Sequence, residues 1–357
     1  MTLDAGGTNL AFTAMQGGEQ VVDEFSLPTN GSNLDRCLSS IVDGFTAVRS
    51  KLEQKPVAIS FAFPGPADYP HGIIGDLPNL PAFRGGVALG PMLEEKFGLP
   101  VFINNDGDMF AYGESVAGFL PFVNDMLRKA GSEKRYRNLL GLTLGTGFGA
   151  GIAINGDMLV GDNANAAGIY LMRNKLFPAA NAEDHVSIRG IRRLYALETG
   201  TAPGNSPTPK EIYDIATGKK GGDKPAALRA YKLMAEAAGD AISHAIALID
   251  GLVVIGGGLA GASELFLPQL VEEMNSSFTD SEGKRSGRLP AEVYNLEDKS
   301  QLSRFLKGSS KEIAVYGSAK RIRYDPEMRI GVGISRMGAT KAISVGAYVI
   351  ALKALDT

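Results

Sequence analysis

Short apolar runs alternate along the chain with longer segments whose apolar residues recur at helical spacing. The apolar runs occupy 57–63, 101–103, 140–144 and 253–255. The helical pattern covers 34–52, 231–249, 265–274 and 339–355, and Asn33 precedes the first of these as a candidate N-cap. This alternation predicts an α/β fold, and a length of 357 residues favours two lobes.

Two glycine-rich turns connect one predicted strand directly to another. Residues 3–9 (LDAGGTN) run into the strand-like residues 10–15, and the turn at 145–149 joins strand 140–144 to strand 150–154. A dinucleotide fingerprint or a Walker P-loop would instead enter a helix, and the P-loop would need Gly-Lys-Ser/Thr, which the chain lacks. The pattern disfavours both of these nucleotide motifs.

The likeness between the two turns indicates an internal duplication of one phosphate-binding hairpin. A tight glycine turn directs successive backbone N–H groups at one point, and a threonine hydroxyl adds another donor. The alternative is a pair of ordinary hairpins that need glycine for positive φ. A third cluster, Gly256 to Gly258, follows a buried strand and precedes a helix, an order that suits a nucleotide base or ribose.

The stretch VFINNDGDMFAYGE begins as a buried strand and then presents Asn104, Asn105, Asp106 and Asp108. A strand-end Asn-Asp pair offers an amide for hydroxyl groups and a carboxylate that can act as a general base. Asp106 is equally suited to cap the next helix, and one residue could do both. Asp108 falls in the first helical turn, where the helix dipole stabilises an acid, so we assign it that structural role.

Charge and cysteine content exclude several classes of protein. The net charge is −3 with no long Lys/Arg run, which argues against nucleic acid as a partner. Cys37 is the only cysteine and the three histidines are scattered, so no zinc spacing exists and a reducing, cytoplasmic setting is expected. No apolar run is long enough for a membrane span, so no membrane partner is expected.

Seven segments in this order resemble the ROK family of sugar kinases and repressors, in the superfamily that includes actin, hexokinase and the Hsp70 ATPase. They are LDAGGTN (3–9), FAFPGP (61–66), LPNL (77–80), NNDGDMFAYGE (104–114), LTLGTGFGAGIAINGDMLVG (142–161), TPKEIYDIA (208–216) and VVIGGGLA (253–260). The resemblance implies two ribonuclease-H-like lobes with a cleft between them, residues 1–113 plus 340–357 and residues 114–339. It also implies a homodimer.

The resemblance further implies ATP and Mg²⁺ as cofactors, and a hexose or related sugar as substrate. The residues matched to the nucleotide are Gly6, Gly7, Thr8, Asn9, Gly145, Thr146, Gly147, Gly256, Gly257 and Gly258, with Asp4 near the metal. Those matched to the sugar are Gly65, Asn79, Asn105 and Asp106, of which Asp106 would accept the proton of the attacking hydroxyl.

Two departures from the family pattern stand after the second hairpin. Members usually carry Gly-Glu-x-Gly-His followed by a Cys-x-Cys-Gly-x-x-Gly-Cys zinc motif, whereas this chain has NAAGIYL at 165–171. Gly168 stands where the glutamate is expected, and no structural zinc is predicted. Losing that acceptor should weaken sugar binding or change the substrate. Glu183 or Asp184 could compensate, with a solvated loop as the alternative.

Three functions therefore remain open. The first is an ATP-dependent kinase of a hexose or related sugar, because both hairpins, Asp4 and Asp106 are present. The second is a sugar-binding sensor or a degenerate member with little kinase activity, a reading motivated by Gly168. The third, a repressor, would need a helix-turn-helix ahead of the first hairpin, and this chain shows none.

Overall fold

The structure is a computed structural model that describes residues 1–6, 9–65, 67–75 and 80–356. It comprises two compact units. Unit 1 contains Met1–Gly118, Gly151–Ala167 and Met337–Thr357, and unit 2 contains Phe119–Ala150 and Gly168–Arg336. The sequence places residues 151–167 in the second lobe, whereas they belong to unit 1, because Gly151 packs closely on the backbone of Gly107 and Asp108.

Unit 1 is built on a five-stranded sheet in which β1 pairs antiparallel with β2 and parallel with β4. In sheet order the strands are β3 (Glu19–Pro28), β2 (Asn9–Gln16), β1 (Thr2–Ala5), β4 (Ile59–Ala62) and β8 (Val101–Asn104). A small antiparallel sheet joins β5 (Ala67–Asp68), β6 (Ile73–Ile74) and β7 (Val87–Ala88).

Helices α1 (Leu34–Lys51) and α2 (Leu89–Phe97) complete the core of unit 1. The Asn33 side chain accepts a hydrogen bond from the Arg36 N–H at 3.0 Å, so the predicted N-cap is confirmed. Phe12, Phe45 and Phe61 are fully buried between the sheet and α1, with the rings of Phe12 and Phe45 5.4 Å apart edge to face. Their burial explains why the apolar stripe of 34–52 points inward.

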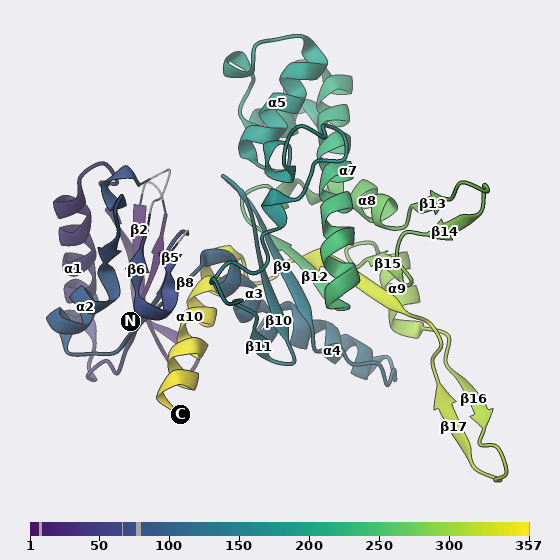
Figure 1. Cartoon of the computed structure of the whole chain (residues 1–357), viewed down its shortest axis with the longest axis horizontal. Coiled ribbons are helices and arrows are strands. Elements are labelled where there is room, and N and C mark those ends of the chain that lie inside the picture. The colour runs from purple at the N-terminus through teal and green to yellow at the C-terminus, as the bar shows by residue number, and fades with distance from the viewer. Residues whose placement is uncertain (7–8, 66, 76–79, 357) are drawn as a thin grey trace. The chain divides into compact units, whose positions relative to one another are not determined.

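Two helices of unit 1 cross with their backbones almost in contact (Figure 1). They are α3 (Asp106–Val116) and α10 (Ala339–Leu355), and the latter has the predicted bounds. A Cβ built on Gly113 would lie 1.9 Å from the Ala342 carbonyl oxygen, and one on Gly346 would lie 2.1 Å from that of Met109. The small residues of α10 therefore allow close packing of α3, the helix that begins at Asp106.

Unit 2 contributes most of a six-stranded sheet, and the chain passes between the units within β10. In sheet order the strands are β11 (Asp157–Met158), β10 (Phe148–Ile154), β9 (Leu139–Leu144), β12 (Leu252–Gly256), β18 (Arg329–Ile334) and β15 (Glu292–Asn295). β9, β12, β18 and β15 are mutually parallel neighbours. Asn155 and Gly156 both have positive φ in the turn between β10 and β11, as the Asn-Gly hairpin signal predicts.

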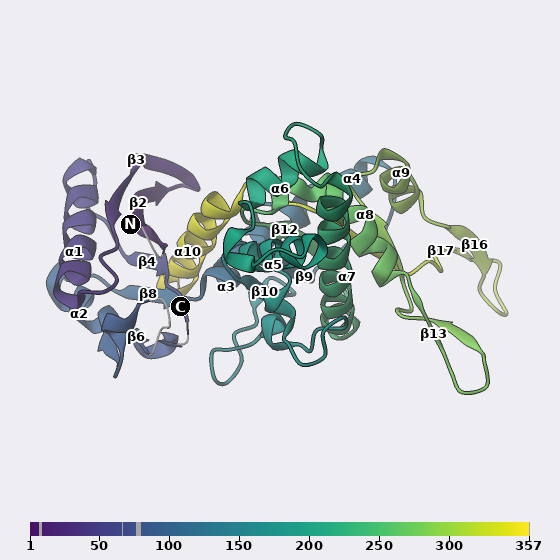
Figure 2. The same cartoon turned by 90° about the horizontal axis from the view of Figure 1, so that it is seen from above.

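In unit 2, one long helix, α7 (Lys224–Ile249), packs against α5 (Ile188–Thr199), α6 (Pro209–Ala216) and α8 (Ser263–Met274), as Figure 2 shows from above. Unit 2 also contains α4 (Phe119–Lys129) and α9 (Lys299–Lys307). Residues 276–287 are mostly polar and include glycine, a composition that predicts a loop, but they form a hairpin of β13 (Ser277–Thr279) and β14 (Arg285–Gly287). A second projecting hairpin joins β16 (Lys311–Ala314) to β17 (Arg321–Tyr324).

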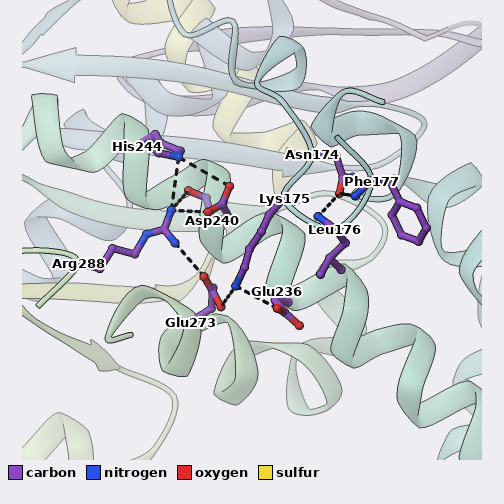
Figure 3. Close-up of polar contacts among 9 residues, drawn as sticks. All are labelled: Asn174, Lys175, Leu176, Phe177, Glu236, Asp240, His244, Glu273 and Arg288. Carbon is purple, nitrogen blue, oxygen red and sulfur yellow. Dashed lines mark hydrogen bonds and ion pairs between the residues drawn. The ribbon is translucent and has the colours of Figure 1, made fainter. Parts of the chain in front are cut away.

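A buried ion network ties α7 and α8 to two loops of unit 2 (Figure 3). Arg288 donates to Glu273 at 2.9 Å and also pairs with Asp240, and both acids are nearly inaccessible to water. Lys175 joins the network through Glu273 at 2.8 Å and Glu236 at 3.0 Å. Because buried charges are tolerated only when paired, these contacts define how the segment around residue 175 docks on the helices.

No helix among the described residues combines the length and the apolarity that a transmembrane span requires.

Candidate functional site

Three neighbouring strands of unit 1 end at the same level of the sheet. Asp4 of β1 lies opposite Ala62 of β4, and Ala62 lies opposite Asn104 of β8, in parallel ladders. The chain segments that leave β4 and β8 carry Gly65, Asn105 and Asp106. Parallel pairing thus brings four of the predicted site residues, Asp4, Gly65, Asn105 and Asp106, to one edge, where ligands of α/β proteins commonly bind.

The helix cap at this edge is Asn105 rather than Asp106, so the predicted capping role of Asp106 is wrong. Asn105 has extended backbone geometry, and its Oδ1 accepts the Gly107 N–H at 2.8 Å. Asp106 is the first residue of α3, and its Oδ1 accepts the same N–H at 2.9 Å. With Asn105 as the cap, the Asp106 carboxylate is not required to begin the helix.

Asp106 is exposed to solvent, although the mass of protein around the strand ends raises its pKa above the ordinary value. The N–H groups of Gly107 and of Asp106 itself oppose this rise. Asp4 is half-buried, and burial, followed by the charges of Asp106 and Glu24, raises its pKa to about 6. An exposed carboxylate beside other acids remains available to accept a proton or to face a cation.

Asp108 does not have the helix-dipole role that its place in the first helical turn indicates. Its side chain is 3% exposed, and Oδ1 has no hydrogen-bond partner. Burial and the nearby charge of Asp106 raise the pKa of Asp108 to about 8. The helix-dipole interpretation is therefore wrong, because Asp108 is held mostly protonated at neutral pH rather than as a stabilised anion.

Replacing Asp108 with asparagine should remove a pH dependence of folding stability. The folded-state pKa is raised from 3.8 to about 8, so the folded chain keeps a proton that the unfolded chain has lost. The Asp108 contribution is therefore fully present below about pH 4 and declines as the pH rises toward 8, by at most about 1.4 kcal/mol per pH unit. Thermal unfolding at pH 5 and pH 8 measures it.

We expect Asp108→Asn to gain stability relative to the wild type on going from pH 5 to pH 8. Asp223→Asn is the matched control, since Asp223 is an exposed carboxylate that caps α7 through the Ala226 N–H at 2.8 Å. Its effect should be equal at the two pH values. An equal effect of Asp108→Asn at both values would show that Asp108 is ionised in the folded protein.

Two hydrogen bonds hold the described part of the first glycine hairpin. The Gly6 N–H donates to the Asn9 carbonyl at 2.9 Å, and the Thr29 hydroxyl donates to the Gly6 carbonyl at 2.7 Å. Gly6 and Asn9 are both exposed. The predicted site residues Gly7, Thr8 and Asn79 lie outside the described residues.

The second and third glycine clusters meet within unit 2. Gly256 lies opposite Thr143 in the β12–β9 ladder, and a Cβ on Gly257 would lie 2.6 Å from the Leu144 carbonyl oxygen. Gly257 has φ +87°, which only glycine adopts readily. Glycine is therefore required at this position both for the positive φ and for the close approach to Leu144. The turn Gly145–Thr146–Gly147 follows Leu144 directly, and Thr146 and Gly258 are both exposed.

Glu183 lies beside this turn rather than in an isolated loop. Its Oε2 accepts the Phe148 N–H at 3.0 Å, and its Oε1 accepts from Arg189 at 3.3 Å. A Cβ on Gly147 would lie 2.6 Å from Oε2. Both oxygens of Glu183 therefore already have hydrogen-bond partners in or near the second hairpin. Gly168, where a glutamate is expected, immediately precedes the 3-10 turn Ile169–Leu171.

One residue at the unit 1 edge escaped the sequence interpretation. Tyr69 is 5% exposed, its hydroxyl donates to the Phe63 carbonyl at 2.8 Å, and the same oxygen accepts from Asn105 Nδ2 at 3.3 Å. Tyr69 follows the FAFPGP motif in a loop with no helical or strand periodicity, so no local pattern signals its role.

A cavity of about 350 Å³ in unit 1 lies at the opposite ends of the strands. Met1, Thr2 and Ala58, near the starts of β1 and β4, line it, and none of the predicted site residues does. It is therefore separate from the edge that carries Asp106. In the described ranges, no group of three or more His, Cys, Asp or Glu side chains converges to hold a metal ion.

Comparison with known proteins decides the family. The model of the ROK family matches residues 1–294, which is most of the chain. The chain belongs to the ROK family. The α/β fold of the actin-like ATPase type predicted from the sequence is thereby confirmed, because solved ROK kinases share it over nearly the whole chain.

Several relatives within the ROK family are sugar kinases. The crystal structure of a glucokinase from Parabacteroides distasonis is 53% identical, with a TM-score of 0.89 over 99% of this chain and 96% of that chain. A ROK family glucokinase from Streptomyces griseus, solved with glucose and AMPPNP, is 18% identical, with a TM-score of 0.62 over 97% of both chains, and shows the shared fold.

A curated relative matches over a shorter region. The glucokinase of Halalkalibacterium halodurans is 28% identical over 204 residues, which are 56% of this chain and 57% of that protein. The chain thus aligns with just over half the length of this relative.

Proposed function

We propose that the protein is a kinase that transfers the γ-phosphoryl group of ATP to a hydroxyl of a hexose or related sugar. The observation that carries the proposal is the exposed Asp106 carboxylate at the edge where β1, β4 and β8 end, next to Asn105 and near Asp4. The relatives named glucokinases support a sugar as the acceptor, and glucose is the first to test.

The residues present fit a nucleotide and a divalent cation. In unit 2, the exposed Thr146 and the open space beside Gly145 and Gly258 would offer a hydroxyl donor and accessible backbone to phosphates and adenosine. In unit 1, Gly6 and Asn9 would contribute in the same way, with Gly7 and Thr8. Asp4 has a raised pKa among other carboxylates, a setting that a hydrated Mg²⁺ would relieve. The metal would neutralise phosphate charge during the transfer.

The chain's own residues would then position the sugar and remove one proton. Asn105 would bind sugar hydroxyls, together with Asn79 and Gly65, the other residues matched to the sugar by the family motifs. As the hydroxyl oxygen bonds to the γ-phosphorus and ADP leaves, the hydroxyl proton would pass to a carboxylate oxygen of Asp106. Asp106 is exposed and is not the helix cap, so its carboxylate would be available for this task.

A coupled assay of ADP release across hexoses, N-acetylhexosamines and pentoses tests the proposal. We expect one sugar, with glucose the leading candidate, to stimulate ADP release well above the sugar-free rate in the presence of Mg²⁺. Chelation of Mg²⁺ should abolish the stimulation. No stimulation by any member of the panel would refute the kinase function.

A sugar-binding protein with little kinase activity is the second candidate. Gly168 stands where an acidic sugar contact is expected, and both oxygens of Glu183 are already bonded within unit 2. Titration calorimetry with the same sugar panel distinguishes the two functions. Binding without ADP release would favour the sensor, whereas binding with turnover would favour the kinase.

A further inference from the structure

Tyr69 lies where three parts of unit 1 converge. It begins the 3-10 turn Tyr69–His71, and its hydroxyl reaches the Phe63 carbonyl at the end of β4 and the Asn105 side chain at the start of α3. The ring is almost wholly buried. The hydroxyl is thus the only described side-chain group with a hydrogen bond to the Asn105 amide nitrogen.

The hydrogen-bond chemistry of this hydroxyl dictates which way the Asn105 amide faces. A tyrosine hydroxyl has one proton, and here that proton is donated to the Phe63 carbonyl at 2.8 Å. Toward Asn105 the oxygen can therefore only accept, so the amide must turn its NH₂ group to Tyr69. The opposite end of the amide, Oδ1, then accepts the Gly107 N–H at 2.8 Å.

This arrangement leaves Asn105 with one side-chain N–H group that can donate to a ligand. One of its two N–H groups is bonded to Tyr69, and the other remains as a donor directed by the same amide plane. Burial, with Asp106 and Asp108 nearby, raises the pKa of Tyr69, so the hydroxyl keeps its proton at any working pH. The hydroxyl therefore keeps the same donor and acceptor roles toward Phe63 and Asn105 across the working pH range.

Gly65 fits the same arrangement. A Cβ built on it would lie 2.9 Å from the Tyr69 hydroxyl and 3.6 Å from Asn105 Nδ2. A side chain at position 65 would therefore push on the Tyr69 hydroxyl. The glycine of the FAFPGP motif keeps the room that the tyrosine needs.

We propose that Tyr69 is a positioning residue that orients the Asn105 amide to donate a hydrogen bond to a sugar oxygen, and that Gly65 makes room for it. The proposal rests on the proposed function, since it concerns the same sugar site. Tyr69 acts through Asn105 and has no part in the proton transfer at Asp106.

The test is the variant Tyr69→Phe, which keeps the ring and removes only the hydroxyl. The KM for the sugar should rise about tenfold, the usual effect of losing one buried hydrogen bond, while the KM for ATP stays within about twofold. In an Asn105→Ala background, Tyr69→Phe should change the sugar KM no further, because the group it orients is gone. Gly65→Ala should raise the sugar KM in the same way.

Tyr136→Phe is the matched control. The Tyr136 hydroxyl is also buried and donates to a backbone carbonyl, that of Arg329, at 2.7 Å in unit 2. The two variants should lower the thermal unfolding midpoint by similar amounts, but only Tyr69→Phe should raise the sugar KM. A wild-type sugar KM in Tyr69→Phe, or a full additional effect on top of Asn105→Ala, would overturn the proposal.

Calorimetric titration of the same sugar separates this proposal from the proposed function. Weaker sugar binding by Tyr69→Phe, with no ADP release even from the wild type, would support the positioning role and refute the kinase. Equal sugar affinity of Tyr69→Phe and the wild type, with normal turnover, would refute the positioning role and leave the kinase standing.

Discussion

Replacement of Asp106 by asparagine is expected to lower kcat for sugar phosphorylation by at least about two orders of magnitude. The asparagine keeps the size of the side chain and an oxygen for the Gly107 N–H, but it cannot accept the proton of the attacking hydroxyl. Because the cap of α3 is Asn105, the helix should still begin normally in the variant. The measurement is steady-state ADP release with the best sugar of the panel.

Asp298→Asn serves as the control for this substitution. Asp298 is a carboxylate at a helix start in unit 2, where it accepts the Gln301 N–H at 2.8 Å, and it lies outside the predicted site. Its kcat should equal that of the wild type. Sugar affinity of Asp106→Asn measured by calorimetry should fall far less than turnover does. Wild-type turnover in Asp106→Asn would show that Asp106 is not the base.

The largest expected effect on stability comes from Gly113→Ala. Alanine normally favours a helix over glycine by about 1 kcal/mol, so an isolated helix would gain. Here the new Cβ would lie 1.9 Å from the Ala342 carbonyl oxygen. The Cβ is fixed to the backbone of one helix and the oxygen belongs to the backbone of the other, so neither atom can rotate away. We expect a net loss of about 3 kcal/mol, or about 5 to 10 °C in the midpoint of thermal unfolding.

Gly261→Ala is the comparison for this variant. A Cβ at Gly261 would meet no atom within 4 Å, so the substitution should move the midpoint by no more than about 2 °C. An unchanged midpoint in Gly113→Ala would mean that α3 and α10 separate easily. In that case α10 would not be needed to hold the helix that begins at Asp106.

Local sequence patterns predicted the elements that depend on neighbouring residues. Asn33 caps α1, the Asn155-Gly156 turn joins β10 to β11, and the apolar period of the last segment matches Ala339–Leu355. The same patterns failed for residues 276–287. Those residues are polar and exposed, and they form a hairpin through pairing that no apolar alternation signals.

The candidate site was only partly predictable for a related reason. Residue types pointed to Asp106, Asn105 and the glycine turns, but capping was assigned to Asp106 and stabilisation by the helix dipole to Asp108. Capping depends on which residue leaves the strand with extended backbone, and that residue is Asn105. The protonation of Asp108 depends on its burial in the folded chain, which its place in the first helical turn does not reveal.

The sequence by itself determined the α/β character and the strand–glycine–strand hairpins, and it singled out Asp4 and Asp106 as candidate site residues. These features depend only on residue type and on the order of neighbouring residues. Only the tertiary structure decided which of them meet. Parallel pairing of β1, β4 and β8 sets Asp4, Gly65 and Asn105 at one edge, and pairing of β9 with β12 sets Gly257 against the second hairpin. Such pairings join residues far apart in the chain, and they are stabilised by long-range hydrogen bonds and burial that a local pattern does not contain.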